Sequence, residues 1–338
     1  MIKLINKIYD RVIKFIKEEY VFLMLLALIL FLGFFHLPYN IYVGGGIINL
    51  DKRVEVEGEK ELNGSYNLVY VKAVNATIPT YLLSYVFDWE RESIEDAKLD
   101  ENDNANDIWE REKIYLQEAN DNAIIAAFSE SNNDILINKE LLKVLYIDKE
   151  SKTDLKIGDT ILKVNDISLR EFSDIKGIIN DFNVGDRIKV HYLRDDKEYD
   201  GYFILREIDE EKKAGLYLVK LFDYQTEKEV KLKFKSSEGG PSGGFMTSLA
   251  IYTKLVDTDL LKGRRIVGTG TIDANGNIGE IGGVKYKLMG AEKAKADIFF
   301  VPEENYDEAM ELKKKKNYKI EVVKVKTLHE AIEYLERM

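Results

Sequence analysis

The 338-residue sequence contains no cysteine and only three histidines. Without cysteine the chain has no disulfides, no thiolate metal ligands and no cysteine nucleophile. The histidines lie far apart in the sequence, at His36, His191 and His329. We therefore expect no metal centre and no cofactor, and a hydrolytic site would have to find its base in another residue type.

A large basic block is also missing. Lys and Arg number 49 against 60 Asp and Glu, which gives a formal net charge of -11. Because phosphate contacts need clustered Lys and Arg, this balance argues against a nucleic-acid partner. With 45% apolar residues the chain can bury a sizeable core, and its length predicts about two folded units.

One long apolar run stands near the N-terminus. Residues 21–37 read VFLMLLALILFLGFFHL, and no Asp, Glu, Lys or Arg occurs from Tyr20 to Leu50. With its flanks the run approaches the thickness of a bilayer core, which predicts an uncleaved transmembrane anchor over residues 21–42. A cleaved signal peptide is the alternative, although the preceding region is long and no small-residue cleavage site follows.

An amphipathic segment, residues 1–20, precedes this run. It carries five basic residues, and none occurs between the run and Lys52. The positive-inside rule then predicts a single-pass protein of the cell membrane with its N-terminus in the cytoplasm and its remaining residues extracytoplasmic. The five residues are Lys3, Lys7, Arg11, Lys14 and Lys17.

Residues 131–208 carry short strand patterns around a turn signal. Strands are predicted over 144–147, 160–164, 187–194 and 202–206, with a helix near 173–180. The turn Leu155-Lys156-Ile157-Gly158-Asp159, followed by ILKVND, resembles a PDZ domain, in which an LxxGD turn precedes a strand and a hairpin. The resemblance implies docking of an extended peptide on a sheet edge. Since no GLGF loop is visible, capture of C-terminal carboxylates stays open, as does use of the module only for packing or gating.

A small-residue loop precedes a helical pattern after residue 235. Ser242 stands in GGPSGG, between Gly-Pro and Gly-Gly. Such neighbours can expose a serine hydroxyl and let a carbonyl group approach backbone N–H groups. A plain turn with Ser242 as helix N-cap accounts for the loop equally well.

Four segments in order resemble the proteolytic domain of the Lon peptidase family: GGPSGG, GTGTID, IGGVKYKLMGAEKAKA and DIFFVP. Together with the apolar run and the PDZ-like region, they resemble the membrane-anchored, PDZ-containing Lon-like peptidases of bacteria. The resemblance implies a dyad of Ser242 as nucleophile and Lys285 as general base, peptide or protein substrates, and a homo-oligomeric ring. The supporting residues that it implies are Thr269, whose hydroxyl helps to hold the lysine, and Gly240, Pro241 and Gly243.

A lysine acts as a base only when it is neutral, and burial lowers its pKa. The small and apolar residues just before Lys285 favour a close-packed, poorly hydrated setting for it. The alternative for Lys285 is a solvated, non-catalytic lysine at a helix start, as we expect for Lys287, Lys293 and Lys295.

Two positions depart from the family pattern. Many Lon proteins have an acidic residue three positions before the serine, where this chain has Gly239, and often an alanine after it, where this chain has Gly243. How the loop is held therefore stays open. No GxxxxGK[ST] sequence occurs in the chain, which predicts proteolysis without ATP.

The predicted architecture is α+β, with an N-terminal transmembrane helix, a PDZ-like β-rich module and a Lon-type α/β proteolytic domain. Residues 43–130 are predicted to form the first part of the Lon-like fold, because the strand at 67–74 and the helix at 123–128 resemble its opening. The PDZ-like module, 131–208, is then inserted before residues 209–338, which carry the dyad. The predicted function is an ATP-independent, membrane-anchored serine endopeptidase for extracytoplasmic peptides. The alternative is a catalytically inert, membrane-tethered PDZ adaptor.

Overall fold

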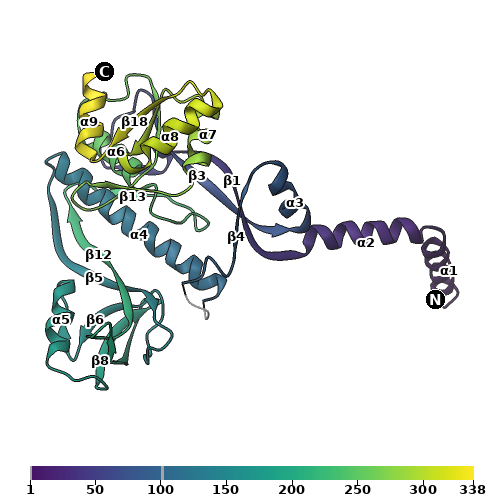
Figure 1. Ribbon diagram of the computed structural model, residues 1–338, viewed down its shortest axis with the longest axis horizontal. Helices are drawn as coiled ribbons and strands as arrows, with labels where there is room; N and C mark the ends of the chain where they lie inside the picture. Colours follow the sequence, from purple (N-terminus) through teal and green to yellow (C-terminus); the bar gives the residue numbers. More distant parts are fainter. Residues whose placement is uncertain (1, 100–102) are drawn as a thin grey trace. The chain divides into compact units, whose positions relative to one another are not determined.

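The computed structural model describes residues 2–99 and 103–338 and divides into two units (Figure 1). Unit 1 comprises the residues up to Val43 and Lys72–Ala97, and unit 2 comprises Gly44–Val71 and Lys98–Met338. Two long strands, β1 (His36–Asn49) and β3 (Ser65–Thr77), each begin in one unit and end in the other.

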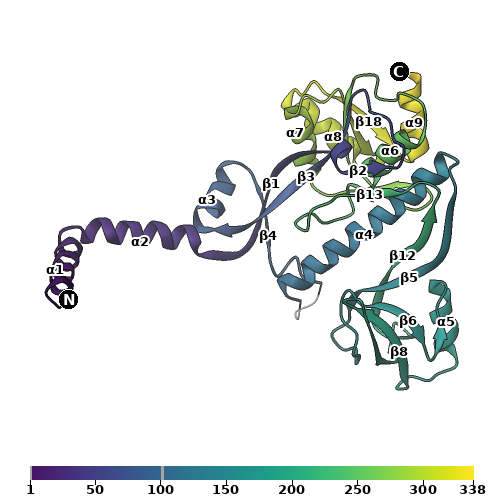
Figure 2. The same cartoon turned by 180° about the vertical axis from the view of Figure 1, so that it is seen from behind.

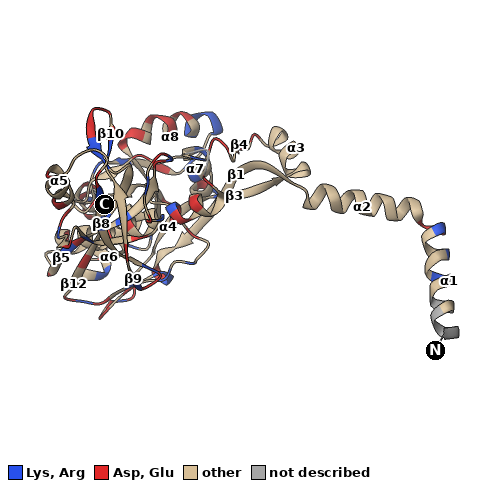
Figure 3. Ribbon diagram, turned by 90° about the horizontal axis from the view of Figure 1, so that it is seen from below, with Lys and Arg blue, Asp and Glu red and all other residues tan. Residues whose placement is uncertain are grey.

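Unit 1 is built from helices and the outer ends of these strands. Its other elements are α1 (Ile2–Glu18), α2 (Tyr20–Phe34), α3 (Ile78–Val86) and β4 (Glu90–Ser93), which pairs antiparallel with β1. A capping box between Thr77 and Thr80 begins α3, because their side chains satisfy N–H groups that the first helical turn leaves open. Helix α2 carries no charged side chain (Figure 3).

The predicted transmembrane anchor over residues 21–42 is wrong. Helix α2 ends at Phe34 after 15 residues, which gives a length of about 22 Å against about 30 Å for a bilayer core. It ends before Pro38, a residue that helix interiors exclude, and the chain enters β1 at His36. Within residues 2–99 and 103–338 no helix is both long enough and apolar enough to cross a bilayer. The predicted fold class is therefore wrong in its transmembrane helix, and the predicted single-pass membrane localisation is wrong for the same reason.

The α/β part of unit 2 surrounds a sheet with the order β18-β17-β14-β3-β1. Parallel pairing joins β3 to β14 (Arg265–Gly268), β14 to β17 (Ile298–Pro302) and β17 to β18 (Glu321–Val325). Alternate residues of β17 enter different cores: Phe300 packs with residues of α6 and α9, and Phe299 packs with residues of α7 and α8. Helices therefore cover both faces of the sheet, as parallel strands require. The helices are α4 (Ala105–Glu130), α6 (Gly244–Leu255), α7 (Val284–Lys293), α8 (Glu303–Lys316) and α9 (Leu328–Arg337).

Short elements complete this part of the unit. A 3₁₀ turn covers Leu50–Lys52, β2 (Val54–Val56) pairs with β13 (Val230–Leu232), and β15 (Thr271–Ile272) pairs with β16 (Ile278–Gly279). The GTGTID segment, residues 268–273, thus includes the end of β14 and all of β15, which belong to different sheets.

The predicted PDZ-like region forms a second sheet with its own core. The sheet order is β12-β5-β6-β8-β9, and the core includes Leu142, Val190 and Phe203. The hairpin between β8 and β9 turns at Asp195 and Asp196, both with positive φ, as a two-residue type I′ turn requires. The elements are β5 (Ile135–Ile147), β6 (Thr160–Val164), β7 (Ile167–Ser168), α5 (Phe172–Asn180), β8 (Arg187–Arg194), β9 (Lys197–Ile204), β10 (Arg206–Ile208), β11 (Glu211–Lys213) and β12 (Leu216–Thr226).

The LxxGD turn has a structural explanation in this region. Gly158 has φ +94°, a conformation that favours glycine. The carboxylate of Asp159 is fully buried and accepts hydrogen bonds from Arg194 Nε (2.7 Å), Arg194 Nη2 (2.6 Å) and the Lys156 N–H (2.6 Å). Because a buried charge must be paired and hydrogen-bonded, the Asp159–Arg194 pair holds the turn against β8.

Helix α4 packs against both α6 and β12 (Figures 1 and 2). Only the segment 123–128 was predicted as a core helix, yet α4 extends over 26 residues from a capping box between Asn104 and Asp107. Its C-terminal residues 123–128 are buried in the core. The longer, mostly polar N-terminal part of α4 contacts the loop that contains Ser242.

Candidate active site

Ser242 is half-buried in the loop between β13 and α6. Its backbone carbonyl accepts hydrogen bonds from the Gly270 N–H (2.9 Å) and from the Thr269 hydroxyl (3.1 Å). Both donors directly follow the carboxyl end of β14, so the central sheet positions the serine. The buried Thr269 thus contacts the serine segment, where the family resemblance had implied a contact with the lysine.

The N-cap of α6 is Gly243, with no side-chain cap, and not Ser242. The carbonyl of Pro241 accepts the Gly244 N–H (3.1 Å) in the turn that leads into the helix. A Cβ atom built on Gly243 would lie 3.1 Å from Leu68 Cδ2, a tight contact. The lack of space beside Leu68 of β3 therefore explains why a glycine follows the serine in this chain.

Two contacts with distant segments hold the loop. Arg53 Nη2 donates to Glu238 Oε1 (2.8 Å), and both side chains are less than one-fifth exposed. Gly240, with φ +86°, donates its N–H to the Glu112 carbonyl of α4 (2.9 Å). These contacts answer the question that Gly239 left open, because the loop is fastened through its neighbours and not through an acidic residue at that position.

The two lysines of the GGVKYK segment differ in burial. Lys285 is half-buried, with its Nζ 5.4 Å from the centroid of the Tyr286 ring. Lys287, which we had expected to be solvated, is only 4% exposed. Removal of water from its charged form lowers the pKa of Lys287 from 10.5 to about 8.

Helical periodicity contained the signal for Lys287. Val284, Lys287, Leu288 and Ala291 stand at positions i, i+3, i+4 and i+7 of α7, and all four are buried. Residues at this spacing share one helix face, and here that face covers the sheet. Lys285 lies one residue beyond Val284 and therefore off the centre of this face.

Helix α7 and the Ser242 loop approach the same two strands. A Cβ atom on Gly290 of α7 would lie 2.9 Å from Val69 Cγ2 of β3, and one on Gly243 would lie 3.1 Å from Leu68 of the same strand. Val267 of β14 belongs to the core that α7 covers, while the residues just after β14 bind the Ser242 carbonyl. The buried lysine and the serine segment are thus both organised by β3 and β14.

Helix α4 contributes a carboxyl group and an aromatic ring beside the loop. A Cβ atom on Gly240 would lie 2.9 Å from Glu112 Oε2, and one on Gly239 would lie 3.3 Å from Trp109 Cζ3. Burial raises the pKa of the Glu112 carboxyl. The sequence pattern around Ser242 contains no hint of these residues, which lie about 130 positions earlier.

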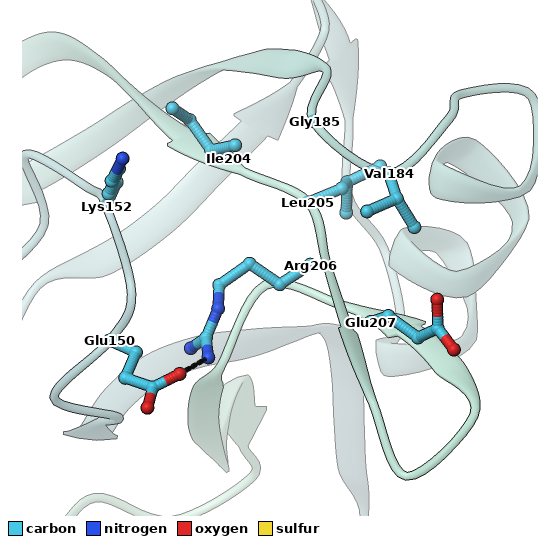
Figure 4. A pocket seen from close by; sticks show the side chains of 8 residues that line it. All are labelled: Glu150, Lys152, Val184, Gly185, Ile204, Leu205, Arg206 and Glu207. Carbon is cyan, nitrogen blue, oxygen red and sulfur yellow. Dashed lines mark hydrogen bonds and ion pairs between the residues drawn. The ribbon is translucent and has the colours of Figure 1, made fainter.

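A pocket of the β-rich region lies apart from these residues. It is lined by side chains that include Lys152, Val184 and Ile204, and an ion pair joins Arg206 to Glu150 at its wall (Figure 4). Neither Ser242 nor either lysine of α7 lines it. Within residues 2–99 and 103–338 no cluster of three His, Asp or Glu side chains is arranged to hold a metal ion.

Comparison with protein families matches residues 234–336 to the family described as Lon protease (S16) C-terminal proteolytic domain. The match includes Ser242, Thr269 and both lysines of α7. It supports serine peptidase activity for this part of the chain. No curated protein matches the chain.

Two solved structures show similarity to a part of this chain. One is the crystal structure of the PDZ domain of an SdrC-like protein from Listeria monocytogenes, with 20% identity and a TM-score of 0.22, covering 25% of this chain and 93% of that chain. The other is the solution structure of a protein from Geobacillus thermodenitrificans, with 20% identity and a TM-score of 0.20, covering 21% of this chain and 83% of that chain.

Proposed function

We propose that this chain is a serine endopeptidase that uses a dyad of Ser242 and Lys287. The observation that carries the proposal is the burial of Lys287, which lowers its pKa to about 8. With that pKa about one lysine in ten is neutral at pH 7, against fewer than about one in a thousand for a solvated lysine. Lys287 therefore meets the physical requirement for a base that was first expected of Lys285.

In the proposed reaction, Ser242 Oγ attacks the carbonyl carbon of the scissile peptide while neutral Lys287 Nζ accepts the hydroxyl proton. Backbone N–H groups of the loop that precedes α6 are suited to stabilise the oxyanion. As the C–N bond breaks, the Lys287 ammonium returns the proton to the leaving amine and an acyl ester remains on Ser242. Water then attacks the ester with Lys287 as base, and the proton returns to Ser242 as the acid leaves.

A serine-directed fluorophosphonate probe distinguishes this enzyme from an inert adaptor. We expect the probe to label the wild-type chain and Ser237→Ala but not Ser242→Ala, and peptide cleavage to follow the same pattern. Ser237 is the matched control because it is an exposed serine of the same loop. Equal labelling of Ser242→Ala would remove Ser242 as nucleophile, and a folded wild-type chain that the probe does not label would favour the adaptor.

We further propose that cleavage needs no ATP and that the PDZ-like region docks or gates protein substrates. Two contacts with α4 support a link between that region and the loop. The Phe222 N–H of β12 donates to Asp121 (3.2 Å), and Lys143 Nζ of β5 donates to Gln117 (2.9 Å). The backbone carbonyl of Glu112 in the same helix accepts the Gly240 N–H. A displacement of β5 and β12 can therefore move α4 and, through it, the loop.

The register of β5 and β12 offers a clean deletion. Ile147 pairs with Leu216, and the Asp148 N–H donates to the Gly215 carbonyl (2.8 Å). Replacing residues 148–215 by Asn-Gly should join the two strands as a hairpin. With circular dichroism to verify folding, we expect this variant to cleave a short peptide but to process an unfolded protein more slowly, both without ATP. Equal processing of the protein would contradict a docking or gating function.

A further inference from the structure

Glu112 is a carboxyl group beside the Ser242 loop, and the cation whose charge acts on it is Arg111. In the part of the chain that the structure describes, its side chain has no hydrogen bond or ion pair. The neighbouring Arg111 is bound by Asp103 at 3.0 and 2.6 Å, with both partners buried. The cation next to Glu112 in the sequence is therefore already neutralised by another carboxylate.

Two further cations near the loop are also engaged. Arg53 binds Glu238 and the Lys233 carbonyl, and Lys113 binds Glu110 at 2.7 Å. Glu112 is half-buried and lies against the Gly240 backbone. A carboxylate in this setting is poorly hydrated, so an incoming cation stabilises its charged form.

Trp109 adds an aromatic surface on the same side of α4. It precedes Glu112 by three residues, a spacing that places two side chains on one helix face. The ring contacts the position of Gly239 and is 36% exposed. The carboxyl and the ring thus flank two consecutive loop residues, Gly239 and Gly240, just before the candidate nucleophile.

We propose that Glu112 and Trp109 form a substrate subsite for a lysine or arginine side chain close to the scissile bond. Gly240 lies two residues before Ser242, so their Cα atoms are at most about 7 Å apart, within reach of a basic side chain of a bound peptide. A basic group can form a charge-assisted hydrogen bond with Glu112 and a cation–π contact with Trp109. This inference rests on the proposed peptidase function and adds its substrate class.

The test compares peptides that differ at one position flanking the cleaved bond, with Lys, Arg, Leu or Glu there. For the wild-type chain we expect kcat/KM to be at least about tenfold higher with Lys or Arg than with Leu. Glu112→Gln should lower the ratio of basic to Leu peptide about tenfold, and Glu112→Lys should favour the Glu peptide. Trp109→Leu should reduce the ratio less, because it leaves the carboxylate in place.

Glu118→Gln is the matched control, since Glu118 is a half-buried carboxyl of the same helix whose pKa is also raised by burial. It should keep the wild-type ratio. No preference for basic peptides in the wild-type chain, or an equal loss for all peptides in Glu112→Gln, would overturn the subsite. Circular dichroism of each variant verifies that the fold is retained.

Binding to Ser242→Ala separates this inference from the proposed reaction. Fluorescence anisotropy should give the same preference for Lys and Arg peptides and its loss in Ser242→Ala/Glu112→Gln. If the wild-type chain cleaves no peptide but this binding preference is present, the reaction fails and the subsite stands. If peptides are cleaved without any preference in cleavage or binding, the subsite fails and the reaction stands.

Discussion

Replacing Lys287 by methionine should raise stability while it removes activity. Methionine has a similar length and no charge, so it fits the buried position without the cost of desolvating an ammonium group. The pKa of Lys287 falls from 10.5 to about 8 on burial. At about 1.4 kcal/mol for each pH unit, protonated Lys287 destabilises the folded chain by about 3 kcal/mol, and this is the gain expected near pH 7.

The gain should depend on pH in a defined direction. Between pH 8 and 10.5 the unfolded chain holds a proton on Lys287 that the folded chain has lost. The wild-type free energy of unfolding therefore rises with pH through this window. The advantage of Lys287→Met should be complete below about pH 8 and should disappear as the pH approaches 10.5.

Urea unfolding of unit 2, followed by the signal of its α/β part at pH 7 and pH 10, measures the effect. Lys285→Met is the matched control, because Lys285 is half-buried and one residue away from the inward face of α7. We expect the control to gain much less stability and to keep peptide cleavage. Equal effects of the two substitutions, or a Lys287→Met enzyme with wild-type turnover, would refute the assignment of Lys287 as buried base.

Three further predictions concern the base, the turn and the loop. The kcat/KM of the wild-type chain should rise with pH along a limb centred near pH 8, and Lys287→Arg should be inactive from pH 6 to 9 because a guanidinium cannot act as base. Retained hydrolysis by that variant would exclude Lys287 as base. Asp159→Ala leaves Arg194 without its buried partner and should lower the free energy of unfolding by about 3 kcal/mol. Hydrogen exchange should show this as lost protection in β6 and β8. Unchanged protection would contradict the prediction. Arg53→Met removes the contact with Glu238 and should slow fluorophosphonate labelling of Ser242 several-fold with an unchanged circular dichroism spectrum, whereas wild-type labelling would show that the loop is held without it.

Local patterns were enough to place several elements of this fold. The strands predicted at 160–164 and 187–194 match β6 and β8. Helix α6 begins at Gly244, the last residue of GGPSGG, in agreement with the helical pattern predicted to follow this loop. These predictions depend on neighbours within about ten residues, which is the range over which periodicity and turn chemistry act.

The same local reasoning failed where an element's extent depends on distant pairing. The apolar run after Tyr20 forms a helix only as far as Phe34, because the chain enters strand β1 at His36. Likewise, the helix predicted over 123–128 is only the C-terminal part of α4, which begins at Ala105. Hydropathy shows which side chains are apolar. It does not show at which residue a helix ends and a paired β-strand begins.

Sequence motifs alone selected Ser242, its glycine-rich loop and the Lon-like segment that follows. Only the tertiary structure distinguished Lys287 from Lys285, since the packing of α7 on the sheet buries one and leaves the other half-exposed. Only the fold brought Arg53 and Glu112 to the loop, from about 130 to 190 residues away along the chain. The physical reason is that desolvation and charge pairing depend on distances in space, and no pattern along the chain fixes those distances.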